Sequence, residues 1–257
     1  DHLFQVISRY DDLLTLEERK GYEPGGTLAL IIPFLIRHGV SLNDILRLTE
    51  TAALTPGATE LISRLQAHGW RVHIITTTYC PYARHMARRL SVDPHNVFAT
   101  VVPLDDYQKL MTPRLLERLG RAEDELAGLE PGRDDQSLKQ SLDDLFWGSE
   151  IELCRLLQET TPMGGRRKLV ALRAISFSYR LSLNETVAVG DSITDRRMLE
   201  AVNTAGGLAI AFNANEYALP HATLSLASTS ILDLWPVLQA WARGGREATM
   251  EVVKNKE

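Results

Sequence analysis

Short apolar segments alternate with helical segments along most of the chain beyond residue 55, and this alternation limits the fold more than any other feature. β-branched and apolar residues predict strands at residues 72–76, 97–102, 186–189, 208–212 and 223–226. Helices are predicted between them, among them 82–90, 166–179 and 194–201. Strands joined by helical crossovers form a parallel sheet that helices cover on both faces. The pattern therefore predicts an α/β fold.

Two regions outside this alternation are predicted to be helical. Residues 1–55 contain three predicted helices and no strand, and residues 103–165 form a long polar stretch with a break at 128–135. We expect a Rossmann-like parallel sheet interrupted by a mostly helical insertion. The predicted segments are a helical region at 1–55, a first core part at 56–102, the insertion at 103–165, a second core part at 166–243 and a charged, frayed tail at 244–257.

The composition excludes several classes of protein. Of the 257 residues, 44% are hydrophobic and 24% are charged, as in an ordinary globular protein, so the bulk of the chain is not disordered. The formal net charge of -5 gives no overall attraction for nucleic acid or anionic lipid. Cys80 and Cys154 are far apart and have no close Cys or His neighbour, so they predict no zinc site. A reducing, cytoplasmic setting is the expectation.

The most apolar run, residues 28–36, is interrupted by Pro33. It is far shorter than the roughly 18 residues that a transmembrane helix needs, so we expect a buried helix and no membrane insertion. The amino-terminal residues also lack the basic and then apolar organisation of a signal peptide.

An acidic pair follows the strand predicted at 186–189. Residues 190–195 read Gly-Asp-Ser-Ile-Thr-Asp, which places Asp191 at the strand end and Asp195 in the first turn of the next helix. Ligands bind beyond the carboxyl ends of the strands in an open parallel sheet, and two carboxylates at that edge suit Mg²⁺. The pair therefore predicts metal ligands. The alternative is that Asp195 is a favourable first-turn acid and Asp191 a turn residue.

A second candidate site follows the strand predicted at 72–76. Thr76, Thr77 and Thr78 present hydroxyl groups near the start of the next helix, and hydroxyl and amide donors together bind phosphate. Alternatively, these β-branched residues extend the strand. Lys168 lies at the start of the helix predicted at 166–179, although a lysine taken alone is usually a solvated surface charge.

Taken together, Thr76, Lys168 and the Asp191 and Asp195 pair resemble the motifs of the haloacid dehalogenase superfamily of phosphatases in their order and strand context. Residues 187–195 and 209–215 are similar to its phosphoserine-phosphatase-like branch. More narrowly, residues 8–12, 21–22 and 27–35 resemble archaeal proteins of the energy-converting hydrogenase A subunit R type. The resemblance covers about residues 56–226, apart from the insertion. It implies a Rossmann-like core with residues 1–55 as a helical cap.

The resemblance also implies a mechanism, in which an Mg²⁺-dependent phosphohydrolase acts on a small phosphorylated metabolite through an aspartyl-phosphate. Thr76 would donate to a phosphoryl oxygen, Lys168 would neutralise the crowded negative charge, and Asp191, supported by Asp195, would hold Mg²⁺. Thr77, Thr78 and Thr194 are expected to contribute to substrate binding. Thr194 stands where phosphoserine phosphatases have an Asn that helps to hold phosphate, so the resemblance does not extend to phosphoserine itself.

The superfamily's nucleophile motif, an apolar strand followed by Asp-x-Asp, is absent from the sequence. The acidic pairs at 11–12, 105–106 and 143–144 lack its spacing or its strand context. In similar proteins the motif lies upstream of the helical cap, in a central strand between those that end at Thr76 and Val189. We expect roughly 30–40 further residues upstream to supply it, at the usual sizes of such elements, or another polypeptide to do so.

Two other functions stay open. A non-catalytic regulatory subunit or phosphate-ligand sensor would keep Thr76, Lys168, Asp191 and Asp195 for binding alone. A response-regulator-like phosphoacceptor would also need an acidic nucleophile, and it would explain the cap poorly. A small phosphorylated substrate is the expected partner, while a protein partner or self-association stays open.

Overall fold

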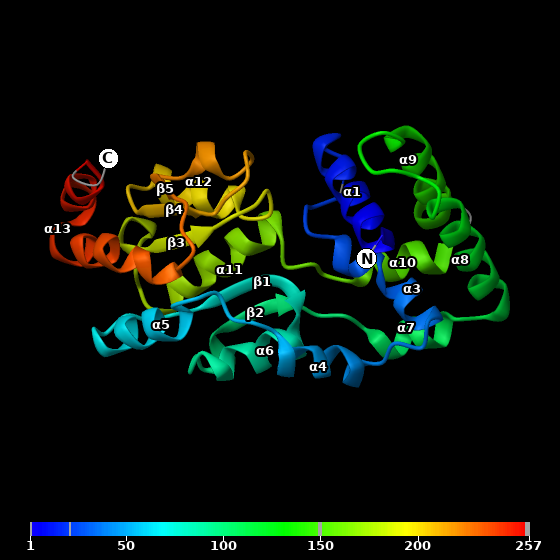
Figure 1. Ribbon diagram of the computed structural model, residues 1–257, viewed down its shortest axis with the longest axis horizontal. Coiled ribbons are helices and arrows are strands. Elements are labelled where there is room, and N and C mark those ends of the chain that lie inside the picture. Colours follow the sequence, from blue (N-terminus) through cyan, green and yellow to red (C-terminus); the bar gives the residue numbers. More distant parts are fainter. Residues whose placement is uncertain (1, 21, 149–150, 255–257) are drawn as a thin grey trace. The chain divides into compact units, whose positions relative to one another are not determined.

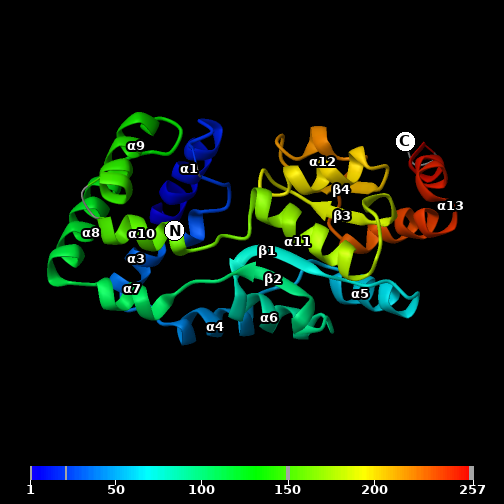
Figure 2. The same ribbon diagram turned by 180° about the vertical axis from the view of Figure 1, so that it is seen from behind.

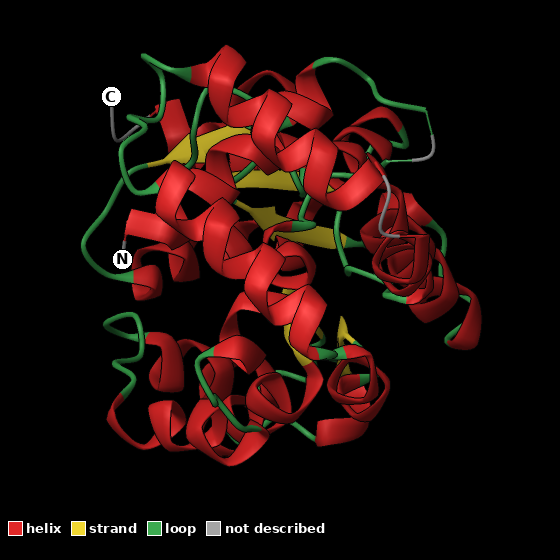
Figure 3. Ribbon diagram, turned by 90° about the vertical axis from the view of Figure 1, so that its right-hand side faces the viewer, coloured by secondary structure: helices red, strands yellow, loops and turns green. Residues whose placement is uncertain are grey.

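The computed structural model describes residues 2–20, 22–148 and 151–254. The chain divides into two compact units. The first consists of Asp1–Glu50, Thr77–Tyr82 and Ala99–Gly164, and the second of Thr51–Thr76, Ala83–Phe98 and Gly165–Glu257. Gly21, in the expected motif at 21–22, lies outside the described residues. Helices make up most of the described chain (Figure 3).

The first unit is helical. One core joins the helices of both parts of this unit, and its largest fully buried side chains include Tyr10, Phe34, Tyr107 and Phe146. The helical cap predicted at residues 1–55 and the insertion predicted at 103–165 therefore share a single hydrophobic core. The helices, most of them labelled in Figure 1, are α1 (His2–Leu16), α2 (Thr27–Leu30), α3 (Ile32–Arg37), α4 (Leu42–Thr51), α7 (Leu104–Leu110), α8 (Pro113–Leu126), α9 (Asp135–Asp143), a π-helical turn (Asp144–Gly148) and α10 (Ile151–Glu159).

The apolar run at 28–36 is buried, as expected, but it forms two short helices. Pro33 occupies one of the first two positions of α3, where its missing N–H costs nothing, and Ile31 separates α3 from α2. Ile32 and Phe34 are almost completely buried. The run therefore belongs to the core of the first unit.

The second unit contains a parallel three-stranded sheet with the order β3-β4-β5. β4 pairs with β3 from Val187↔Leu208 to Gly190↔Ala211, and with β5 from Ile210↔Leu224 to Phe212↔Leu226. This confirms the α/β fold class. The elements that lie wholly in this unit are α5 (Ala58–Ala67), α11 (Gly165–Ser178), β3 (Val187–Gly190), α12 (Arg196–Thr204), β4 (Leu208–Phe212), β5 (Leu224–Leu226) and α13 (Trp235–Lys254), with 3-10 turns at Pro94–Asn96, Leu183–Glu185, Leu219–His221 and Ile231–Leu234. Three further elements are divided between the two units: β1 (Ile74–Tyr79), α6 (Cys80–Arg89) and β2 (Val97–Thr100).

β4 shows why helices cover both faces of this sheet. Side chains alternate between the faces of a strand, so Leu208, Ile210 and Phe212 point to one side and Ala209 to the other. The first three pack with α5 and α13. Ala209 packs with α11 and α12, whose close approach the small side chain permits. All five residues of β4 are buried, as in a strand enclosed by a parallel sheet.

β1 lies further along the chain than predicted. The expectation was a strand at 72–76 followed by threonines at a helix start, but β1 continues through Thr76, Thr77 and Thr78 to Tyr79, and α6 begins at Cys80. β-branched and aromatic side chains favour extended backbone, and this preference extends the strand. β1 and β2 lie side by side as a separate two-stranded sheet (Figures 1 and 2).

The predicted frayed tail is wrong for residues up to 254. α13 continues to Lys254, although its backbone is non-helical at Gly244 and Gly245. Arg246 holds the part of α13 that follows these glycines against the rest of the unit. Its guanidinium donates hydrogen bonds to Asn203 and, over 3.2 Å, to the hydroxyl of Thr223. Within the described residues, no helix is both long enough and apolar enough to cross a bilayer.

Candidate active site

The turn after β3 folds around the carboxylate of Asp195. Its Oδ2 accepts hydrogen bonds from the backbone N–H of Asp191 and of Ser192, at 3.2 and 3.4 Å. The hydroxyl of Ser192 donates to the same oxygen over 3.4 Å. A side chain four residues along therefore fixes the main chain that carries Asp191.

The other oxygen of Asp195 binds Lys168. Lys168 Nζ donates to Asp195 Oδ1 over 2.8 Å, and the exposed fractions of the two side chains are 7% and 5%. A buried charge is tolerated when it is paired and hydrogen-bonded. The alternative that Lys168 is a solvated surface charge is therefore wrong.

Two glycines allow this close packing. A Cβ on Gly190 would lie 2.5 Å from Cβ of Asp195, so no larger residue fits between the end of β3 and the carboxylate. Gly165 opens α11 with a φ of 47°, in the left-handed region that glycine adopts readily. Its N–H donates to the carbonyl of Thr194 over 3.0 Å, which ties the start of the Lys168 helix to the turn.

Asp191 lies beside this pair and is more accessible. The residue as a whole is exposed, but its carboxyl group is partly enclosed by the turn. That burial and the neighbouring charge of Asp195 raise the pKa of the Asp191 carboxyl above its ordinary value, while Lys168 acts in the opposite direction. Asp191 is therefore the carboxylate of the pair with oxygen atoms accessible from solvent.

Lys168, Asp191, Asp195 and the backbone of Thr194 thus meet in one turn. Thr76 lies on β1 within the same unit, and its neighbour Ile75 packs against the apolar cluster that contains Ala188 of β3 and Leu172 of α11. Thr77 and Thr78 belong to the first unit, where the Thr77 carbonyl accepts the hydroxyl of Thr100 over 2.5 Å.

The sequence pattern did not identify Ser192 and Gly190 as residues of the site. Ser192 also has its hydroxyl 2.9 Å from that of Thr194, so it helps to hold both the turn and the carboxylate of Asp195. The sequence feature that could have identified them is a glycine directly before Asp191 and a hydroxyl residue directly after it. A turn that brings two carboxylates together needs a residue without a side chain and a donor for the charge.

The donor set is suited to a hard cation with few protein ligands. Within the described residues, no group of three or more His, Cys, Asp or Glu side chains is arranged to hold a metal ion. Mg²⁺ usually takes only one or two carboxylates, and water and substrate phosphate complete its coordination. Asp191 supplies an accessible carboxylate of this kind. Asp195 fits less directly, because Lys168 and the backbone amides already occupy both of its oxygens.

Comparisons with known proteins agree with this architecture. No family model matches the sequence, and neither does any curated protein. The solved structure of gene product AF1437 from Archaeoglobus fulgidus matches with 33% sequence identity and a TM-score of 0.86, over 99% of this chain and 78% of that one. A substrate-bound phosphoserine phosphatase complex matches with 16% identity and a TM-score of 0.53, over 91% of this chain and 90% of that one. The chain therefore has the Rossmann-like fold of haloacid dehalogenase proteins, and it belongs to the same family as gene product AF1437 of Archaeoglobus fulgidus.

Proposed function

We propose that this protein is an Mg²⁺-dependent phosphohydrolase of the haloacid dehalogenase superfamily that acts on a small phosphorylated metabolite. The observation that carries the proposal is the buried Lys168 and Asp195 pair directly beside the more accessible Asp191. A charge network of this kind at the end of a parallel strand suits the binding of phosphate and a cation. The fold shared with phosphoserine phosphatase supports the same class of reaction.

The residues have different roles in this proposal. Lys168 neutralises negative charge where carboxylates and phosphate crowd together, and Thr76 donates a hydrogen bond to a phosphoryl oxygen. Thr77, Thr78 and Thr194 contribute to the substrate-binding set. Asp195 is a positioning residue, since it holds Lys168 with one oxygen and the Asp191 backbone with the other.

Asp191 is the residue that would hold Mg²⁺, with Asp195 in support. When bound, the cation offsets the negative charge of the phosphoryl group and orients it for attack. The partly enclosed position of Asp191 strengthens its interaction with a cation, because water screens charges less there than in the bulk.

The nucleophile is a further part of the proposal. The sequence given contains no Asp-x-Asp, so the proposal assigns the attacking carboxylate to none of the residues named above. As the narrower assignment we propose the hydrogenase A subunit R type, which residues 8–12 and 27–35 resemble. A cytoplasmic location is proposed from the sparse use of cysteine, with two cysteines in 257 residues. Thr194 makes a substrate other than phosphoserine the better proposal.

A non-catalytic regulatory or phosphate-binding subunit is the second candidate. The absence of Asp-x-Asp from the sequence favours it. Lys168, Asp191 and Asp195 would then bind a phosphorylated ligand and a cation without turnover. The two candidates differ in one chemical product, the covalent phosphoenzyme.

Rapid acid quenching of the full polypeptide during reaction with a phosphorylated substrate tests the proposal. A panel of small phosphate monoesters supplies the substrate, and intact mass spectrometry reads the result. The phosphohydrolase predicts a protein mass increased by one phosphoryl group in the presence of Mg²⁺, and free phosphate on longer incubation. Ligand binding without either product would contradict it and support the regulatory subunit.

A further inference from the structure

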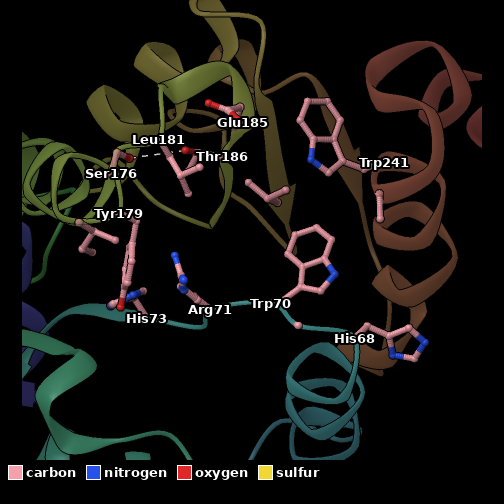
Figure 4. Close-up of a pocket in the computed structure, with 14 residues that line it drawn as sticks. His68, Trp70, Arg71, His73, Ser176, Tyr179, Leu181, Glu185, Thr186 and Trp241 are labelled. Atoms are coloured by element: carbon pink, nitrogen blue, oxygen red, sulfur yellow. Dashed lines mark hydrogen bonds between the residues drawn. The ribbon is translucent and has the colours of Figure 1, made fainter.

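Helix α11 is apolar on two opposite faces, but the second unit covers only one of them. On the inner face, Leu169 and Leu172 pack with the apolar cluster of the sheet. Ser176 near the end of the helix, and Tyr179 just beyond it, line a cavity on the same side (Figure 4). A surface helix normally has one apolar stripe toward the core and polar residues opposite, whereas a helix that is apolar all round is enclosed. The outer face of α11 therefore needs an explanation.

The outer face carries Val170, Ala174 and Phe177, all of them exposed. Their spacing of i, i+4 and i+7 places them in one stripe along the helix. Phe177 is 83% exposed, the largest fraction among the large apolar side chains of the described residues, and Val170 is 55% exposed. Single exposed apolar residues are common on protein surfaces, but an aligned set at this spacing is the pattern by which helices recognise one another.

The end of α11 that carries Phe177 is firmly held. Arg180 adopts a φ of 56°, and its N–H donates to the carbonyl of Phe177 over 3.0 Å. The N–H of Leu181 donates to the carbonyl of Ser176 over 2.9 Å, which completes a Schellman motif. The hydroxyl of Ser176 also lies 3.5 Å from that of Thr186 (dashed line in Figure 4). The exposure of Phe177 is therefore a property of a well-formed helix, and a partner would meet a surface that is already ordered.

The charges on α11 are all positive. The chain has 33 acidic and 28 basic side chains, yet α11 contains no acidic residue. Lys168 is buried on the inner side, but Arg173 is exposed and lies three positions from Val170, along one edge of the stripe. Arg166, also exposed, lies four positions before Val170 on the same side. The stripe is thus apolar along its length and basic along its edge.

We propose that the outer face of α11 binds an amphipathic helix of a partner protein, apolar along one side and acidic beside that side. The apolar side of the partner covers Val170 and Phe177, and its carboxylates pair with Arg173 and Arg166. Ala174, a small residue between the two larger ones, lets the helices approach closely. This inference goes beyond the proposed function and does not rest on it.

Charge favours this occupant over a second copy of the chain. In a two-fold dimer the same patch meets itself, so the arginines of one α11 would lie near those of the other. An acidic helix instead complements the positive charge. At 1.5 Å per residue the 14 residues of α11 span about 21 Å, which a partner helix of about four turns would cover. A contact between single helices is small, as in transient complexes.

Two synthetic peptides of about 15 residues, each stapled as a helix, test the proposal by fluorescence anisotropy. They share leucines at i, i+4, i+7 and i+11 and differ only beside that stripe, with glutamates in one and lysines in the other. We expect the glutamate peptide to bind with a Kd at least about 10-fold lower, and this preference to shrink at high salt, because salt screens exposed charges. Equal Kd values, or no binding of either peptide at millimolar concentration, would overturn the proposal.

Variants of the protein locate the binding. Phe177→Ser is expected to raise the Kd of the glutamate peptide by about 10-fold or more, because a large aromatic side chain carries much of the energy of an interface. Leu219→Ser, at another exposed apolar residue of the second unit, is the control and should leave the Kd unchanged. Arg173→Glu should lower the preference for the glutamate peptide by about threefold or more, and Arg173→Lys should keep it. The same response to Phe177→Ser and Leu219→Ser would contradict the site.

Two further measurements distinguish other occupants. Sedimentation velocity reads self-association of the protein alone, and a dimer that Phe177→Ser dissociates would assign the face to a second copy. Flotation with vesicles of phosphatidylcholine and phosphatidylserine reads lipid binding, and binding that Phe177→Ser abolishes would assign the face to a membrane surface. Either result would overturn the proposal, which predicts a monomer that stays unbound to the vesicles.

Discussion

Lys168 and Asp195 form an ion pair of 2.8 Å, although 27 positions separate them in the sequence and both side chains are almost fully buried. The pair joins the start of α11 to the start of α12 beneath the turn that carries Asp191. Because Asp195 also accepts two backbone N–H groups of that turn, the charge of Lys168 and the position of Asp191 are mechanically linked.

Asp195→Ala is expected to destabilise the protein by about 3–5 kcal/mol, because it leaves the Lys168 ammonium buried without a partner. In a cycle with Lys168→Met, urea unfolding should give a coupling energy of about 0.5–3 kcal/mol. The exposed Arg121 and Glu117 pair on α8 is the control, with an expected coupling of at most about 0.5 kcal/mol. Equal coupling in the two cycles would show that burial does not strengthen the Lys168 pair.

Gly190→Ala is expected to push Asp195 away from the end of β3, because the new Cβ would lie 2.5 Å from that of Asp195. Overpacking of this kind costs about 1–3 kcal/mol. Thermal unfolding and Mg²⁺ titration should both report the change. Gly128→Ala is the matched control, since no atom lies within 4 Å of its Cβ position. Unchanged stability and Mg²⁺ affinity in Gly190→Ala would contradict the packing described for the turn.

Asp143 in the first unit gives a pH prediction. Burial alone would raise the pKa of its carboxyl, but hydrogen bonds from Lys139, Tyr10 and Arg19 outweigh that effect and hold it below the ordinary value of 3.8. The unfolded chain therefore takes up this proton first on acidification. The contribution to stability is complete above the ordinary pKa and is lost as the pH falls through the lower folded value.

Asp143→Asn should accordingly lower stability at neutral pH and flatten its fall below about pH 4, measured by urea unfolding across pH. Asp124→Asn is the control, because Asp124 is an exposed residue of the neighbouring helix α8. If the stability of Asp143→Asn falls as steeply below about pH 4 as that of the wild type, other carboxylates cause the acid destabilisation.

Thr76→Val is expected to lower kcat/KM for a phosphorylated substrate by about 10- to 100-fold, the value of one hydrogen bond to a charged group. The valine keeps the shape and strand preference of threonine, so the loss isolates the hydroxyl. Thr76→Ser should retain most of the activity. Equal kinetics for the valine variant and the wild type would remove Thr76 from the site.

The elements that the sequence predicted best are those whose own residues determine them. β4 was predicted at the residues that it occupies, because a fully apolar segment bounded by glycine has few alternatives. The spacing of Asp191 and Asp195 likewise follows from a local turn. The burial of Lys168 was harder to predict from the sequence, because a lysine is buried only where the fold brings a charged partner to it.

Other features depend on contacts that sequence patterns do not contain. Tyr10 donates to Asp143 over 2.6 Å across 133 positions, and Trp147 donates to Tyr10. This network ties the amino-terminal helices to the insertion, and no local periodicity predicts it. The limits of β1 were missed for a different reason, because threonine suits both a strand and a phosphate-binding turn.

Phosphate release by the full polypeptide, with the wild type and Asp191→Asn compared in Mg²⁺ and in excess EDTA, tests the proposed phosphohydrolase most directly. Asparagine keeps the size of the side chain and removes its charge, so folding is expected to survive. We predict Mg²⁺-dependent release by the wild type, abolished by EDTA and at least about 100-fold slower in Asp191→Asn, as for the loss of a key electrostatic group. Release that persists in EDTA, or that is unchanged in Asp191→Asn, would contradict the site.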